Sequence, residues 1–350
     1  MLAVSLVLCA AASAVLAAPF NAVRPRASQV TPLSTTDISN LTSFIQFARL
    51  PVLVTLLAIY QVVGPVNELV NWTCGQACEA NPNFEVALTG GMGDAVQFCK
   101  SEPPGDELFA HSSRVFVGYY PETNSVIISH EGTDPVELMS DLTDLNVLKG
   151  SLNSTLFPGA PSNIEVHTGF RDEHAITADA IREATQSLIA TKNATQVTVV
   201  GHSLGGALAE LDALSLRLIL PKTVGVNAYT FGTPRVGDTN FVTFFDSQVP
   251  DFKRVNNQKA KLTGLPFSFE AHPLLNIVPI VPGRFLGFDH PQGEIHFVSD
   301  NNDTVVACPG NDDSTDPQCQ IQTVPSILDG DILNHLGPYN GIHLGTIFCT

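Results

Sequence analysis

Basic side chains are scarce in this chain. Among its 350 residues, 17 lysines and arginines stand against 34 aspartates and glutamates, a formal net charge of −17 at pH 7. A surface with this balance repels the phosphates of nucleic acids and of anionic membranes, so neither is expected as a partner. The same charge favours solubility outside the cell. With 44% hydrophobic residues and no internal repeat, the chain can form one large globular core.

A membrane-spanning run is missing from the body of the chain. The segment 50–67 has no charged residue, but Gln61, Gly64 and Pro65 interrupt its apolar residues. A membrane span needs about 20 predominantly apolar residues. We therefore expect a buried or misplaced segment here rather than a transmembrane helix.

The first 17 residues contain no lysine or arginine, yet they have the other marks of a secretory signal peptide. They are apolar from Leu2 to Val15 and reach small residues at Ala17 and Ala18. We expect cleavage after residue 17, a single domain over residues 18–350, and secretion of the protein. N-glycosylation sequons agree with that route. They begin at Asn40, Asn71, Asn153, Asn193 and Asn302.

Cysteine is sparse as well. Of seven cysteines, Cys9 falls in the predicted signal peptide, and two short separations among the rest predict local disulfides in an oxidising compartment. No second Cys/His pair at zinc-ligand spacing accompanies them, so no metal site is expected. The expected pairs are Cys74 with Cys78 and Cys308 with Cys319, while the partners of Cys99 and Cys349 stay open.

The most informative residues are Val197 to Gly206. Val197 to Val200 predict a buried strand, and the apolar residues after position 203 recur at helical spacing. Between them, Gly201 and Gly205 bracket Ser203 in the pattern Gly-X-Ser-X-Gly. A sharp strand-to-helix turn of this kind exposes the serine hydroxyl at the carboxyl end of a strand. The segment therefore predicts a serine hydrolase.

Strands and helices are predicted to alternate along the rest of the chain. Residues 113–120 and 125–130 predict a hairpin, helices are expected over 34–48, 172–190 and 204–220, and a strand over 224–231. This order predicts an α/β fold with a mostly parallel sheet covered on both faces. The helix over 172–190 is expected to bury one face, formed by Ile176, Ala180, Ala184 and Leu188.

Six short motifs follow one another between about residue 70 and residue 349. They are His130–Thr133, His167–Phe170, Gly201–Gly206, Tyr229–Asp238, Gly287–Pro291 and His335–Tyr339. In this order they resemble the fungal class 3 (Rhizomucor/Thermomyces-type) triacylglycerol lipases. The resemblance implies an α/β-hydrolase with helices on both faces of the sheet and a short lid helix. It implies neither a metal nor an organic cofactor.

The resemblance also implies roles for single residues. Ser203 would attack an ester carbonyl, and His335 would take the serine proton and return it to the leaving alcohol. The oxyanion hole would use the amide of Leu204 and the amide and hydroxyl of Thr133. His202, beside the nucleophile, is expected to point in another direction.

The position of the triad acid departs from the family. The family has an aspartate before a Val-Pro-X-X-Pro stretch, and here Asn276 stands at that place. An amide can hold the histidine in the wrong tautomer, which costs about 10⁴-fold in turnover in a serine protease. Glu270 and Asp289 are the nearest acidic alternatives, and neither matches the motif. The identity of the acid stays open at this point.

A lid helix is implied directly after Thr133. Its expected apolar face lacks the tryptophan often found in such lids, since Trp72 is the single tryptophan of the chain. Without family context, such an apolar stripe is more typical of an ordinary core. Whether the protein is a true lipase or a plain esterase therefore stays open. The apolar face comprises Val136, Leu138, Met139 and Leu142.

Three stretches interrupt family-like flanks, namely residues 50–66, 99–114 and 260–276. In each of them, the residue pattern fits neither a helix nor a strand well. One hypothesis is that some or all are translated introns, and the alternative is that they are real loops of a divergent enzyme. The sequence of the mature transcript decides between the two.

We therefore expect a secreted, monomeric serine ester hydrolase that cleaves acylglycerols or related esters. A lipid–water interface is the candidate place of action. A feruloyl-type esterase on the same scaffold is one alternative. A catalytically inactive protein that binds lipids or esters is an alternative of another class, and Asn276 is the residue that favours it.

Overall fold

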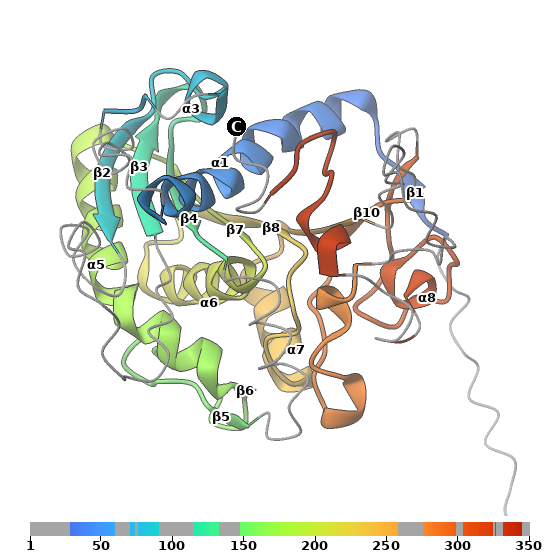
Figure 1. Ribbon diagram of the computed structural model, residues 1–350. Helices are drawn as coiled ribbons and strands as arrows, with labels where there is room; N and C mark the ends of the chain where they lie inside the picture. Colours follow the sequence, from blue (N-terminus) through green and yellow to red (C-terminus); the bar gives the residue numbers. More distant parts are fainter. Residues whose placement is uncertain are drawn as a thin grey trace, which may run out of the picture.

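The computed structural model describes residues 29–59, 71–73, 76–90, 115–132, 148–257, 276–298, 304–324, 326 and 332–344, with the backbone alone over 50–59. A nine-stranded sheet in the order β1-β11-β10-β9-β8-β7-β4-β3-β2 runs through the centre of this part (Figure 1). Its five middle strands, from β10 to β4, are parallel, and the strands outside them pair antiparallel. The predicted mostly parallel sheet is confirmed.

The strands of the large sheet are β1 (Thr31–Pro32), β2 (Glu85–Gly90), β3 (Val115–Tyr120), β4 (Ser125–His130), β7 (Gln196–His202), β8 (Gly225–Phe231), β9 (Phe252–Asn257), β10 (Glu294–Phe297) and β11 (Val305–Ala307). A small second sheet pairs β5 (Lys149–Ser151) with β6 (Glu165–His167). The α-helices are α1 (Thr35–Ile59), α3 (Gln76–Glu79), α5 (Thr168–Lys192), α6 (Leu204–Ile219), α7 (Thr239–Gln248) and α8 (Gln320–Thr323). Short 3₁₀ turns are η2 (Pro121–Thr123), η3 (Val278–Ile280), η4 (Arg284–Leu286) and η6 (Ile332–Leu336).

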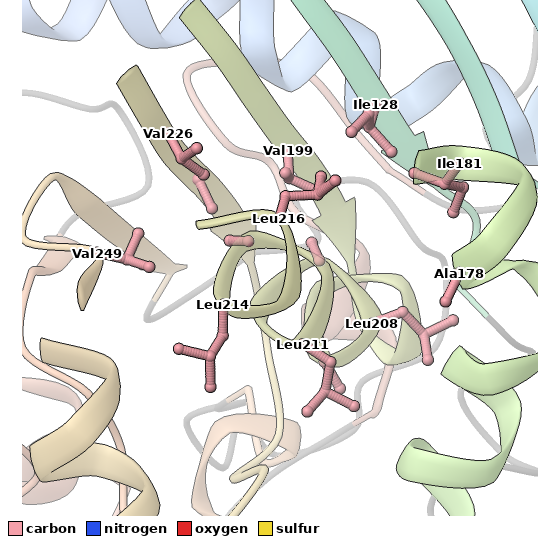
Figure 2. Packing of buried hydrophobic residues seen from close by; sticks show 14 of the residues in the cluster. Ile128, Ala178, Ile181, Val199, Leu208, Leu211, Leu214, Leu216, Val226 and Val249 are labelled. Atoms are coloured by element: carbon pink, nitrogen blue, oxygen red, sulfur yellow. The ribbon is translucent and has the colours of Figure 1, made fainter. Parts of the chain in front are cut away.

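Alternate residues of the sheet face two separate cores. In β7, Val197 and Val199 pack into the cluster that includes α5 and α6, whereas Val200 packs into the cluster on the side of α1. This is the period of two that a strand imposes on its side chains. Figure 2 shows Val199 and its strand neighbours meeting the leucines of α6 and two residues of α5. Helices therefore cover both faces, as predicted.

The predicted hairpin is present, because β3 and β4 pair antiparallel around η2. The helix expected from residue 34 begins as α1 at Thr35. Ser34 caps it, since Ser34 Oγ accepts from the amide of Asp37 at 3.1 Å and Asp37 Oδ2 accepts from Ser34 Oγ at 2.6 Å. The helix predicted over 204–220 is α6.

The buried face predicted for α5 is wrong. Ile176 is 46% exposed and Ala180 is exposed as well. The prediction considered apolar residues only. The face that is buried includes His174, whose imidazole binds a carboxylate on α6. The buried residues of α5 are Phe170, His174, Ala178, Ile181, Thr185 and Leu188.

That carboxylate belongs to Asp212, and it joins three elements. Its two oxygens lie 2.6 Å from Nε2 of His130, the last residue of β4, and 2.9 Å from Nε2 of His174 on α5. All three side chains are buried. Burial alone would raise the pKa of Asp212, but the charge of His174 and hydrogen bonds from both histidines outweigh it and hold that pKa at about 2.

Asp212→Asn should remove a pH-dependent part of the stability. The lowered pKa means that the carboxylate stabilises the folded state above its unfolded value of about 3.9, and that this stability is lost as the pH falls towards 2. The contribution at neutral pH is about 2 kcal/mol. Urea unfolding between about pH 2 and pH 5 measures it. If the free energy of unfolding changed with pH in the same way in the variant and in the unsubstituted protein, the role of Asp212 would be contradicted.

The disulfide expected between Cys308 and Cys319 is present, with the two Cα atoms 5.9 Å apart. It closes the loop between β11 and α8. Cys78 is also disulfide-bonded. Cys74, Cys99 and Cys349 lie outside the described residues.

Several other expectations concern residues that the structure does not describe. These are the signal peptide, the lid stripe Val136, Leu138, Met139 and Leu142, the oxyanion residue Thr133, Glu270, residues 60–66 and 99–114, and residues 260–275. In the described part of the chain, none of the helices has both the length and the apolar character that crossing a membrane requires.

Candidate active site

Ser203 occupies the tight turn between β7 and α6. Its backbone lies at φ 60° and ψ −128°, a conformation that residues other than glycine rarely adopt. A Cβ at Gly201 would lie 2.0 Å from the carbonyl oxygen of Gly205, and one at Gly205 would lie 2.4 Å from that of His130. Only glycine fits at either position. The two glycines of the motif therefore allow three backbone segments, the end of β7, the start of α6 and the end of β4, to approach one another at the serine.

Amide donors surround this turn. Leu204 opens α6, and the first amides of a helix have no acceptor within it and carry partial positive charge. The segment after β4 passes beside the nucleophile, because a Cβ at Gly132 would lie 3.0 Å from Cβ of Ser203. Thr133 is the next residue in the sequence and lies outside the described residues. Its own donor role stays a prediction.

His335 lies in η6 and is completely buried. Gly232, at φ +56° after β8, makes room for it, since a Cβ there would lie 2.7 Å from Cε1 of the His335 ring. Sequence reasoning missed this role, although the glycine belongs to the motif Tyr229–Asp238. Within the described residues, neither Nε2 of His335 nor Oγ of Ser203 has a hydrogen-bond partner.

His202 supports the ring of His335. The two rings stack with their centroids 4.4 Å apart, and Nε2 of His202 lies 2.9 Å from the backbone oxygen of His335. Burial lowers the pKa of His202 to about 4, so it is neutral at pH 7. Its Nε2 is engaged with the main chain, so His202 is not available as a base through that atom.

Asn276 lies where the triad acid would lie. Its Oδ1 is 3.2 Å from Nδ1 of His335, and both side chains are buried. Asp289 is engaged elsewhere, since its Oδ1 accepts from the amide of His290 at 3.0 Å. With no carboxylate facing the ring among the described residues, burial and the neighbouring His202 hold the pKa of His335 well below its ordinary value.

Arg235 holds the segment that carries Asn276. Its guanidinium donates to the carbonyl oxygens of Ile280 and, at 2.8 Å, Pro282, and to Asp312 Oδ2 at 2.5 Å. Arg235 and Asp312 are both buried. This buried ion pair depends on both partners, because a lone buried charge is strongly destabilising.

Arg235→Leu should lower the free energy of unfolding by about 3–5 kcal/mol, because it leaves Asp312 buried without its partner. Urea unfolding monitored by circular dichroism measures the change. Arg182→Ala is the control, since its 2.9 Å ion pair with Asp179 lies at the surface and should contribute less than about 1 kcal/mol. Equal losses in the two variants would contradict the role of Arg235.

Comparisons with known proteins agree on one family. The model of the family described as lipase (class 3) matches residues 128–269. The chain is 27% identical over 224 residues to the secreted mono- and diacylglycerol lipase MDL3 of Malassezia globosa, covering 63% of this chain and 66% of that protein. It is 31% identical over 195 residues to a lipase of Rhizomucor miehei, covering 54% and 46%.

Solved structures show the same fold. The triacylglyceride lipase of Rhizomucor miehei superposes with a TM-score of 0.66 at 22% identity, covering 92% of this chain and all of that one. The Lip2 lipase of Yarrowia lipolytica does so with a TM-score of 0.66 at 19% identity, covering 91% and 97%. The fold is therefore that of the α/β-hydrolases. Within that class, the chain is similar to the class 3 lipases, whose family model matches it over residues 128–269.

The matches leave part of the relatives unaligned. The chain spans 66% of MDL3 and 59% of a second Malassezia globosa relative, the secreted mono- and diacylglycerol lipase LIP1. Activity and substrate therefore belong to the proposal below.

Asn276→Asp should raise kcat/KM for a soluble short-chain ester by at least about 10²-fold, because a carboxylate stabilises the imidazolium that forms during attack. It should also raise the pKa of His335. Since the base works in its neutral form, the acid limb of the pH profile should move from below about pH 6.5 to higher pH.

The pH dependence of kcat/KM measures both effects. Asn240→Asp, which adds the same charge at an exposed position of α7, is the control and should alter neither. An unchanged acid limb in Asn276→Asp would show that position 276 does not serve His335.

Proposed function

We propose that this protein is a monomeric, secreted serine ester hydrolase that cleaves acylglycerols through an acyl-Ser203 intermediate. One observation carries the proposal. Ser203 stands in the strained turn between β7 and α6, and the unpaired Nε2 of His335 belongs to the ring that stacks on the neighbouring His202. These features support Ser203 as the nucleophile and His335 as its general base.

The chemistry follows from these groups. Oγ of Ser203 attacks the carbonyl carbon of the ester while Nε2 of His335 takes its proton. The amides of Leu204 and Thr133 stabilise the negative oxygen of the tetrahedral intermediate. The intermediate expels the alcohol, which receives the proton from His335. A water molecule, deprotonated by the same ring, then releases the acid and restores Ser203.

The relatives support the substrate class and the route of export, since several are named secreted mono- and diacylglycerol lipases. The surface supports contact with lipid. Leu148 is 66% and Phe285 84% exposed. Their neighbours touch, because Nζ of Lys149 lies 3.5 Å from the carbonyl oxygen of Gly287. Exposed apolar side chains of this size suit contact with a lipid–water interface.

A second function is favoured by Asn276. Without a carboxylate beside His335, the same site would bind an ester without cleaving it. Such a protein would keep the fold and the turn at Ser203. The difference between the two functions is chemical, so a covalent probe separates them.

A fluorophosphonate should label the unsubstituted protein at Ser203, and Ser203→Ala should abolish both the label and ester hydrolysis. The fold should survive, since Oγ of Ser203 makes no hydrogen bond within the described part of the chain. Mass spectrometry locates the label, and Ser247→Ala, at an exposed position of α7, is the control that should label normally. Ester binding without any label would instead identify the inactive binding protein.

A further inference from the structure

Two buried side chains besides His335 contact the amide of Asn276. Asn257 ends β9, and Tyr339 follows η6. Nδ2 of Asn276 lies 2.9 Å from Oδ1 of Asn257 and 3.3 Å from the hydroxyl oxygen of Tyr339. Both neighbours are buried, so water does not replace either bond. The orientation of the Asn276 amide therefore depends on what these two neighbours can donate and accept.

Asn257 can offer only an oxygen to Asn276. Its other side-chain atom lies 2.9 Å from the backbone oxygen of Asn334, and a backbone carbonyl accepts hydrogen bonds but never donates them. The nitrogen of Asn257 must therefore face Asn334. Its oxygen is left for Asn276, which must answer with Nδ2.

Tyr339 imposes the same orientation from another side. Its hydroxyl donates its single hydrogen to the backbone oxygen of His335 at 3.2 Å. The hydroxyl oxygen can then only accept from Asn276. A turned amide would place Oδ1 of Asn276 against two acceptors and lose both hydrogen bonds. With Nδ2 held in this way, Oδ1 faces Nδ1 of His335 at 3.2 Å.

We propose that Asn257 is a positioning residue that orients the Asn276 amide and thereby sets the tautomer of His335. An oxygen at 3.2 Å accepts the proton of Nδ1, so the lone pair stays on Nε2. This inference rests on the proposed role of His335 as the general base. It differs from the expectation that an amide fixes the wrong tautomer, since here Asn276 keeps the directing function of an aspartate and lacks only its charge.

Nuclear magnetic resonance of the whole protein with ¹⁵N-labelled histidine tests the tautomer directly. Two-bond ¹H–¹⁵N correlations show which ring nitrogen carries the proton, and the spectrum of His335→Gln identifies the signal. We expect the proton on Nδ1 in the unsubstituted protein. A proton on Nε2 would overturn the proposal.

Two substitutions at position 257 separate positioning from packing. Asn257→Leu removes the oxygen that holds Asn276, so the signal should move towards the Nε2-protonated form. Asn257→Asp keeps an oxygen towards Asn276 and should keep the proton on Nδ1. If Asn257→Leu fails to fold, the spectra of Asn257→Asp and of the unsubstituted protein still show whether the proton lies on Nδ1 of His335. A folded Asn257→Leu with an unchanged tautomer would show that Asn257 is merely structural.

A double-mutant cycle gives the kinetic counterpart. In the unsubstituted protein, Asn257→Leu should lower kcat/KM by on the order of 10- to 10²-fold through loss of the active tautomer. In the Asn276→Asp background it should cost little, because both carboxylate oxygens accept and no orientation is needed. Equal losses in both backgrounds would overturn the proposal.

The spectra require no substrate. A protein that shows the Nδ1 tautomer but neither hydrolyses esters nor labels at Ser203 would refute the proposed function and leave this inference standing. A protein that hydrolyses esters with its resting proton on Nε2 would refute this inference and leave the proposed function standing.

Discussion

The site depends on how closely three stretches of backbone approach one another at Ser203. The end of β7, the start of α6 and the end of β4 meet where Gly201 and Gly205 have no space for a Cβ. This contact lifts the serine out of the strand, directs the amides of α6 towards it and brings residue 132 alongside. A single added methyl group at either glycine would push the nucleophile away from its donors.

Local signals made much of this architecture predictable. The valine run, the bracketed serine and the leucine period lie within one short segment, and the hairpin needs only neighbouring residues. The buried face of α5 was not predictable in this way, because His174 is buried through a contact with Asp212 that lies 38 residues away. The motif placed Asn276 correctly in the sequence. The direction of its amide depends on Asn257 and Tyr339, 19 and 63 residues away, which no local pattern reveals.

Asn276 separates two functions that one aspartate usually combines. A triad carboxylate both points the imidazole and stabilises its positive charge. The described structure keeps the first through hydrogen bonds with buried neutral groups. The second is absent, so nothing at position 276 offsets the burial and the neighbouring His202 that lower the pKa of His335. The effect of orienting the His335 ring and the effect of a negative charge beside it can therefore be measured separately at position 276.

The two halves of the machinery are distant along the chain. The contact between His202 and His335 closes a separation of 133 residues. Chains fold progressively as they leave the ribosome, beginning from the N-terminal side. The serine turn is thus synthesised well before residue 335, and a chain interrupted between them would lack the proposed base. If the proposed mechanism holds, hydrolysis itself reports that synthesis has passed residue 335.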